Sequence, residues 1–386
     1  MIPGTVLIRP PASTQEVGSC FLRAHRITGT PLFWDAAKQA GNAIACSQGR
    51  YGGWAAVAHR NETCDPHGGS QDDAIETLDD GASQSAVKFL MDLAAAQATK
   101  TDRPPSWLAD GMGRGLDFFL IAHDENGGWP QQYPKSDEDD YSNYATLNDG
   151  VVTEVISTLL HAYRQTGRKR YRSAARRGGD FLLKAQGPPS QPAWAQQYDA
   201  QLRPAAARAF EPAAYGSEET GFAMNALLDL YAVTGDRRFL KGLAAARDWL
   251  ERSTIRPGTW ARLYEIGTNR PIYGDRDGKV HSSLAEISEE RHAGYRWEGA
   301  FPSVTRALAR YQALLDGGRE GLRTQTEALE RRARRKSHEE ALGRLPAIVS
   351  SVHPGQGWID NNGIVDTNTF IKNCRTILHA LEFAPR

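Results

Sequence analysis

Acidic residues recur at equivalent positions of this 386-residue chain, and they are its first candidates for chemistry. They occur as pairs about 70 residues apart, each just before a helical pattern: Asp79 and Asp80 in TLDDG, Asn148 and Asp149 in TLNDG, and Glu218 and Glu219 in GSEET. Carboxylate and amide oxygens without cysteine favour Ca²⁺ or Mg²⁺ over transition metals. If the helix starts meet at one rim, the pairs predict a cation site or a set of catalytic carboxylates.

A purely structural explanation of the acidic pairs also stays open. Acidic residues at a helix start can cap the free N–H groups and compensate the helix dipole, which would account for any single pair. In the first repeat Pro11 stands where Asp149 stands in the third. The fold therefore does not require a carboxylate at this position, which favours a functional role.

Arginines in irregular segments are the second set of candidates. Arg208 lies in ARAFEP, an insertion that the other repeats lack, and Arg262 and Arg276 lie among aromatic residues in WARLYEIGTNRPIYGDRDG. Guanidinium forks match carboxylates, and aromatic rings offer platforms for sugars. For Arg270 we expect an ordinary solvated side chain. Arginines beside a hard cation site predict an acidic carbohydrate as the ligand.

A repeat of about 69 residues supplies the elements that would position these residues. Helical patterns end in Thr-Gly at 28–29, 166–167 and 234–235, and units close with WPQQY (129–133), WAQQY (194–198) and WARLY (260–264). The apolar stripe of Val152, Ile156 and Leu159 follows one helix face, and helices are expected over 149–165 and 218–234. Strand patterns are almost absent. Stacked αα-hairpins must bury their apolar faces, so we predict an all-α fold, an (α/α) toroid of about five to six hairpins, with an open solenoid as the alternative.

Composition and the C-terminal region complete the prediction of a single domain, 1–386. Lys and Arg number 46 and balance 46 Asp and Glu, which gives no electrostatic reason to expect nucleic acid as a partner. No apolar run approaches the roughly 20 residues of a membrane span, so no membrane partner is expected either. The charged segment 318–345 predicts a solvated helix, and 355–383 predicts one last motif followed by a closing helix. We expect a monomer.

The motifs together resemble the pectate lyases of polysaccharide lyase family 10. The resemblance covers about residues 15–305, in order and with similar spacing. Beyond it, 306–386 forms a C-terminal extension. The motifs that carry the resemblance are TLDDG, GGWPQQYP with TLNDG, WAQQYD with ARAFEP, WARLYE with TNRPIYGDRDG, and EISEERHAGYRW. The family has an (α/α) toroid fold and cleaves polygalacturonate by Ca²⁺-dependent β-elimination, so both are expected here.

Carried over residue by residue, the resemblance implies a role for each candidate. Arg208 would be the base that removes the C5 proton. Asp79 and Asp149 would belong to the Ca²⁺ centre, with Asp80 standing where the family often has Asn. The resemblance also implies substrate-binding residues: Arg262, Arg276, Asn148 and Trp129. The sequence departs from the family at Gly52-Gly53-Trp54-Ala55, where the family has GGWP.

Two alternatives to a lyase remain at this stage. A toroid glycoside hydrolase acting on an acidic polysaccharide would use two carboxylates, such as Asp149 and Glu219, as acid and base. A non-catalytic homologue would only bind uronates. The N-terminus has no basic region followed by an apolar core, so no signal peptide is visible, although a polymeric substrate predicts a secreted or periplasmic protein.

Overall fold

The computed structural model describes residues 4–60, 75–99, 103–137, 140–353, 357–359 and 363–382. The chain divides into two compact units. The first comprises residues 1–121 together with 327–386, and the second comprises residues 122–326. Residues 327–386 are therefore grouped with the N-terminal hairpins in the first unit. That the two units form a single domain stays a prediction.

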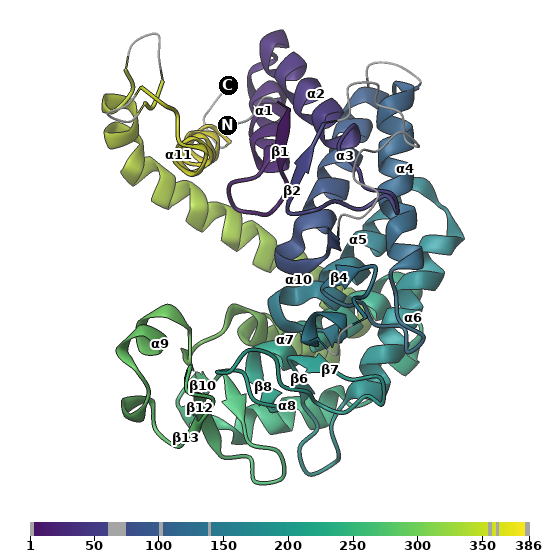
Figure 1. The fold of residues 1–386 in the computed structure, drawn as a ribbon, viewed down its shortest axis with the longest axis vertical. Helices are drawn as coiled ribbons and strands as arrows, with labels where there is room; N and C mark the ends of the chain where they lie inside the picture. Colours follow the sequence, from purple (N-terminus) through teal and green to yellow (C-terminus); the bar gives the residue numbers. More distant parts are fainter. Residues whose placement is uncertain are drawn as a thin grey trace. The chain divides into compact units, whose positions relative to one another are not determined.

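Helical hairpins build the first unit (Figure 1). Helix α1 (Thr14–Thr28) packs along α2 (Pro31–Ala45), and α3 (Ala82–Ala98) packs along α4 (Ser106–Ile121). Helix α11 (Thr367–Leu381) lies against α1, so the first and last helices of the chain are neighbours. The remaining short elements of this unit are β1 (Thr5–Leu7), β2 (Val57–His59), β3 (Glu76–Thr77) and the 3₁₀ turn η1 (Asp79–Gly81).

The second unit repeats the hairpin arrangement. Helix α5 (Val151–Thr166) packs on α6 (Lys169–Ala185), and α7 (Ser217–Thr234) packs on α8 (Leu243–Arg252). Helices α5 and α7 also lie side by side, as the repeat predicts for 149–165 and 218–234. The chain of α10 (Pro302–Ser350) turns at Gly318, after which Thr326 accepts a hydrogen bond from Arg310 at 3.0 Å. This turn forms a further hairpin within the segment for which the sequence predicted only a charged helix, 318–345.

The Thr-Gly landmarks end helices by one recurring arrangement. The hydroxyls of Thr28, Thr166 and Thr234 each donate to the carbonyl four residues earlier, at 2.9, 2.7 and 2.6 Å. The glycine that follows each threonine is left-handed, with φ of 71°, 68° and 72°. Glycine takes this conformation without strain and so ends a helix readily. The predicted helix ends are confirmed.

The tryptophan of the repeated motif is a core residue. The indole N–H groups of Trp54, Trp194 and Trp260 donate to Ile44, Leu182 and Leu250 at the ends of preceding helices. Trp358 makes the same bond to Ile348, so the predicted last motif is present. The motif tyrosine completes the loop, since the hydroxyls of Tyr198 and Tyr264 accept backbone N–H bonds from Ala195 and Ala261. The motif thus recurs because it attaches each loop to its hairpin.

Short strands, which the sequence did not predict, lie in the loops of the second unit. A five-stranded sheet has the order β13-β12-β11-β8-β6, and its longest strand is β12 (Pro271–Gly274). Strands this short show no alternation of apolar residues, which explains why they were missed. The other elements of this unit are β4 (Gln132–Tyr133), η2 (Tyr141–Asn143), β5 (Ala145–Thr146), η3 (Asn148–Gly150), β6 (Trp194–Ala195), β7 (Gln197–Tyr198), β8 (Tyr215–Gly216), η4 (Arg237–Leu240), β9 (Thr254–Arg256), β10 (Thr259–Ala261), β11 (Leu263–Tyr264), β13 (Val280–His281), η5 (Leu284–Glu286), α9 (Glu289–Gly294) and β14 (Glu298–Gly299).

Among the described residues, no helix combines the length and apolar character that a membrane span needs.

Candidate active site

The repeated acidic pairs do not cap their helices. Asp79–Gly81 and Asn148–Gly150 form single 3₁₀ turns, and the N-cap positions of α3, α5 and α7 are Gly81, Gly150 and Gly216. None of these three helices has a side-chain capping hydrogen bond. Side-chain capping is therefore not the reason for the acidic residues.

The turns hold two aspartates in an uncommon backbone conformation. Asp80 and Asp149 both have φ of 52°, in the left-handed region that residues other than glycine rarely occupy. Strained positions of this kind gather at functional sites. The shared geometry confirms that these two residues occupy equivalent places in their repeats.

In the first unit the carboxylates of Asp79 and Asp80 share one arginine. Arg9 contacts Asp79 through Nη2 and Asp80 through Nε, each at 2.5 Å. Burial raises the pKa of Asp79, the negative charge of Asp80 raises it further, and Arg9 opposes both. The two aspartates therefore form a site of concentrated negative charge.

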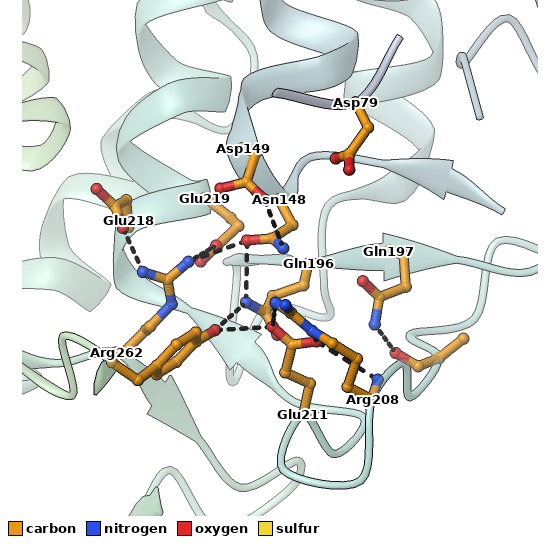
Figure 2. Close-up of polar contacts among 12 residues, drawn as sticks. Asp79, Asn148, Asp149, Gln196, Gln197, Arg208, Glu211, Glu218, Glu219 and Arg262 are labelled. Atoms are coloured by element: carbon orange, nitrogen blue, oxygen red, sulfur yellow. Dashed lines mark hydrogen bonds and ion pairs between the residues drawn. The ribbon is translucent and has the colours of Figure 1, made fainter. Parts of the chain in front are cut away.

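In the second unit Arg262 is the centre of a buried polar cluster (Figure 2). Its Nη1 donates to Glu218 at 2.7 Å, and its Nη2 donates to the side-chain oxygen of Asn148 at 2.9 Å and to Glu219 at 3.4 Å. Burial alone would lower the pKa of Arg262, but the charge of Glu219 and of its other neighbours outweighs burial and raises it. Arg262 is 8% exposed, so its guanidinium already serves the fold.

Glu219 lies beneath this cluster with no exposed surface. Its Oε2 has no hydrogen-bond partner, and a side chain at Gly216 would collide with it. Burial raises the pKa of Glu219 to about 7, against the opposing charge of Arg262. This carboxyl group is therefore poised between its two protonation states near neutral pH.

Hydrogen bonds connect Arg262 to Arg208 through the neutral side chains of Asn148, Gln196 and Tyr295 and then through Glu211. Asn148 also accepts from Gln196 Nε2 at 3.3 Å, and Gln196 Nε2 donates to the Tyr295 hydroxyl at 3.0 Å. The Tyr295 hydroxyl in turn donates to Glu211 Oε1 at 3.0 Å. Asn148 also donates to Asp149 at 3.2 Å, which ties the left-handed turn to the same network.

Arg208 lies at the exposed end of the network and forms a bidentate pair with Glu211. Nε and Nη2 of Arg208 contact the two oxygens of Glu211 at 2.7 and 2.6 Å. The carboxylate is 1% exposed, whereas 47% of the Arg208 side chain remains exposed. The hydrogen bonds to Glu211 outweigh partial burial and raise the pKa of Arg208, so the pair stabilises the protonated guanidinium.

Three guanidinium groups surround the ring of Phe210. Those of Arg208, Arg276 and Arg291 lie 4.8, 5.5 and 4.4 Å from the ring centroid. Arg276 is largely exposed and pairs with Glu290 at 2.8 Å, whereas Arg291 is buried. Arg208 and Arg276 therefore present an exposed cationic surface, as expected for residues that meet an anionic ligand.

The structure brings some of the predicted site residues together and excludes one of them, Trp129, from contact with a substrate. Asn148, Asp149, Arg208 and Arg262 share the electrostatic network of the second unit. Asp79 and Asp80 lie together in the first unit. Trp129 is fully buried against Gly178, where a Cβ atom would come within 2.6 Å of the indole. The prediction that Trp129 binds substrate is therefore wrong for this conformation, because a ring without exposed surface offers no platform.

Several residues of the network were missed in the sequence. Glu211 stands three residues after Arg208 in ARAFEP, a spacing at which opposite charges often pair in a tight turn, and this signal was available. Gln196 occupies the place in WAQQY that Arg262 occupies in WARLY, so the repeat itself identified the two as equivalent. Tyr295 and Arg9 carried no local signal, because their partners are distant in sequence.

Comparison with known proteins identifies the family. The profile of the pectic acid lyase family matches residues 48–259 and 254–305. The chain belongs to the pectic acid lyase family. It is accordingly a polysaccharide lyase with a pectate lyase-type function. No curated protein matches the chain.

Similarity to solved structures shows the fold of this lyase. An alanine mutant of the family 10 polysaccharide lyase from Cellvibrio cellulosa, in complex with trigalacturonic acid, is 19% identical with a TM-score of 0.57, covering 79% of this chain and 98% of that one. The family 10 polysaccharide lyase from the same organism is 21% identical, with a TM-score of 0.54 over 75% of this chain and 94% of its own. A cellobiose 2-epimerase from Bacillus thermoamylovorans is 12% identical, with a TM-score of 0.50 over 96% and 87%. The fold is the predicted all-α (α/α) toroid.

The donors available for a metal are oxygens. Asp79, Asp80 and Asp149 offer carboxylate oxygens, and none of the three caps a helix. Ca²⁺ prefers such ligands. In donor chemistry these residues therefore fit the expected Ca²⁺.

Proposed function

We propose that this lyase cleaves polygalacturonate by calcium-dependent β-elimination. Asp79, Asp80 and Asp149 would hold the cation, and Arg208 would accept the proton from C5. Arg276 would bind a uronate carboxylate, because it is exposed and its pair with Glu290 is solvated.

One observation carries the proposal for the chain's own residues. Asp149, Arg208 and Arg262 come from three different segments, yet they belong to one electrostatic network of the second unit. A network in which acidic and basic groups lie next to an exposed guanidinium suits an anionic substrate. Family membership supplies the substrate class, and the network supplies groups with matching charge.

The reaction requires a proton acceptor at C5 and a neutralised carboxylate beside it. The C5–H bond breaks, its electron pair forms the C4–C5 double bond, and the C4–O bond to the leaving sugar breaks. The leaving oxygen then takes a proton from water. A bound calcium ion would supply electrostatic neutralisation of the uronate carboxylate, which makes the C5 proton more acidic. Arg208 would supply the acceptor within hydrogen-bond reach of C5.

The Arg208–Glu211 pair sets a condition on this role. A guanidinium held by a buried carboxylate stays protonated and cannot accept a proton. The proposal therefore requires the pair with Glu211 to open when substrate binds, with Arg208 then facing C5 and not a carboxylate. The half-exposed position of Arg208 leaves room for this rearrangement, while Tyr295 continues to donate to Glu211.

The hydrolase alternative is disfavoured by the position of Glu219. A general acid or base must reach the glycosidic oxygen or an attacking water. Glu219 has no exposed surface and lies behind Arg262, so it does not contact a sugar in this conformation. The same assay separates all three possibilities, as follows.

The test is incubation with polygalacturonate in the presence of Ca²⁺ or of a chelator. We expect ultraviolet absorbance from the unsaturated product to appear with Ca²⁺ and to be lost with the chelator. New reducing ends without this absorbance would indicate hydrolysis. Binding of the polymer without any bond cleavage would indicate a non-catalytic homologue.

Asp149→Asn tests the metal role without new backbone strain, since asparagine also tolerates the left-handed region. We expect Ca²⁺-dependent activity to fall at least tenfold, while the circular dichroism of the helices stays unchanged. Asp248→Asn, which alters an exposed carboxylate paired with Arg247, is the control. Full activity of Asp149→Asn at limiting Ca²⁺ would remove Asp149 from the cation site.

A further inference from the structure

Arg9 lies outside the family-matched segment and yet contacts two of the residues expected to hold the cation. Its guanidinium bridges Asp79 Oδ2 and Asp80 Oδ2, each at 2.5 Å. One positive charge thus compensates two adjacent carboxylates. No role follows for Arg9 from the family match, because that match begins at residue 48.

The backbone at Arg9 is fixed, whereas its side chain is accessible. Ile8 is fully buried, and the N–H groups of Ile8 and Arg9 both donate to the carbonyl of Ala56, at 3.0 and 3.3 Å. Gln15 donates to the carbonyl of Ile8. Half of the Arg9 side chain is exposed. The guanidinium can therefore leave the carboxylates by side-chain rotation, without disturbing the backbone segment that carries it.

We infer that Arg9 is a displaceable internal counter-ion of Asp79 and Asp80, which a divalent cation replaces when it binds. This inference rests on the proposed calcium site. The guanidinium occupies the carboxylate oxygens that would ligate the cation, and two positive groups so close would repel each other. Occupancy by Arg9 and occupancy by the cation therefore exclude each other.

Competition of this kind weakens cation binding by a moderate factor. Exposed ion pairs shift equilibria by no more than about fivefold, so Arg9 should be easily displaced. The benefit of the contact is stability without the cation, because the two carboxylates would otherwise repel each other across one turn. Arg9 therefore sets how much cation the site requires.

The test compares Ca²⁺ binding by calorimetry in the wild type, Arg9→Ala and Arg9→Lys. We expect Arg9→Ala to bind Ca²⁺ about two- to fivefold more tightly than the wild type, with Arg9→Lys in between. Arg23→Ala, which removes a different arginine–carboxylate pair of the same unit, should leave the Ca²⁺ affinity unchanged.

Thermal unfolding supplies a second readout that does not depend on activity. In chelator, Arg9→Ala should unfold at a lower temperature than the wild type, and saturating Ca²⁺ should remove this difference. A purely structural Arg9 would lower the unfolding temperature equally in both conditions.

Each other result overturns the inference in a recognisable way. Equal Ca²⁺ affinity of the wild type and Arg9→Ala would reject the competition and leave the calcium site intact. Weaker binding by Arg9→Ala would show that Arg9 supports the site and does not compete for it. Absence of Ca²⁺ binding in both proteins would reject the calcium assignment together with the inference.

Discussion

Arg208 and Glu211 form a two-point ion pair in which the carboxylate is buried and the guanidinium is half exposed. The pair fixes the orientation of Arg208 and at the same time keeps it protonated. A fixed orientation helps Arg208 to act as a proton acceptor, whereas a protonated guanidinium cannot accept a proton. The two effects can be separated by changing each partner in turn.

Arg208→Ala should remove turnover and leave most of the binding. Losing a positioned proton acceptor typically costs about 10²–10⁴-fold in kcat, whereas binding also depends on other groups. Arg208→Lys should lose activity on a similar scale, because it keeps the charge and changes the shape of the group. Steady-state kinetics on polygalacturonate measure kcat and KM of both variants. Arg203→Ala, which removes the exposed arginine that pairs with Asp199, is the control. Near-normal kcat with a raised KM would make Arg208 a binding residue.

Glu211→Gln should change the pH dependence of the reaction. The carboxylate is the main cause that raises the pKa of Arg208, so its removal lowers that pKa. If Arg208 must be deprotonated to act, the rising limb of kcat/KM against pH should move to lower pH. The maximal rate should fall, since the guanidinium is no longer oriented. A limb that does not move would mean that Arg208 acts only as a fixed cation.

Substitution of Arg262 should lower stability, whereas substitution of Arg276 should weaken substrate binding. Arg262→Met leaves Glu219 buried without its partner, which should cost about 3–5 kcal/mol of unfolding free energy. Adding Glu219→Gln should restore part of the loss. Arg276→Ala removes an exposed side chain and should leave the unfolding free energy unchanged while raising KM. Denaturant unfolding and kinetics test the pair, and equal stability of Arg262→Met and the wild type would contradict the buried network.

Glu219 should make stability fall as pH rises. Its pKa is raised from 4.5 to about 7 in the folded state, so between these values the folded chain binds more protons than the unfolded one. The resulting stability is complete below about pH 4.5 and is lost as pH rises through about 7, with a total of roughly 3 kcal/mol. Glu219→Gln should lack this component. Unfolding temperatures of both proteins at pH 5 and pH 8 measure it, and parallel pH profiles would disprove the shift.

Periodicity made the fold predictable and also produced the error at Trp129. The Thr-Gly helix ends and the tryptophan motif recur because every hairpin needs the same hydrogen bonds, so their spacing revealed the architecture. Trp129 belongs to this recurring set, and its recurrence already favoured a core role over a unique contact with substrate. Residues that differ between repeats are better functional candidates, as Arg262 in place of Gln196 illustrates.

The network around Arg208 was only partly predictable, because its partners come from distant parts of the chain. Tyr295 lies 84 residues from Glu211 and contacts it only after the loops fold back on the hairpins. The strands that guide this return are two to four residues long and leave no pattern in the sequence. Local spacing could identify Glu211, but it could not show that Glu211 is buried and holds Arg208.

The packing of α11 on α1 has a practical consequence for anyone who trims this chain. Cys20 and Ala24 of α1 are buried with Ile371 and Leu378 of α11, and Arg375 pairs with Glu16 at the edge of the contact. A fragment that stops at residue 305, where the family match ends, would lose α11 and expose the apolar face of α1 to solvent. Such a fragment should aggregate in solution, because the last helix covers the apolar surface of the first hairpin.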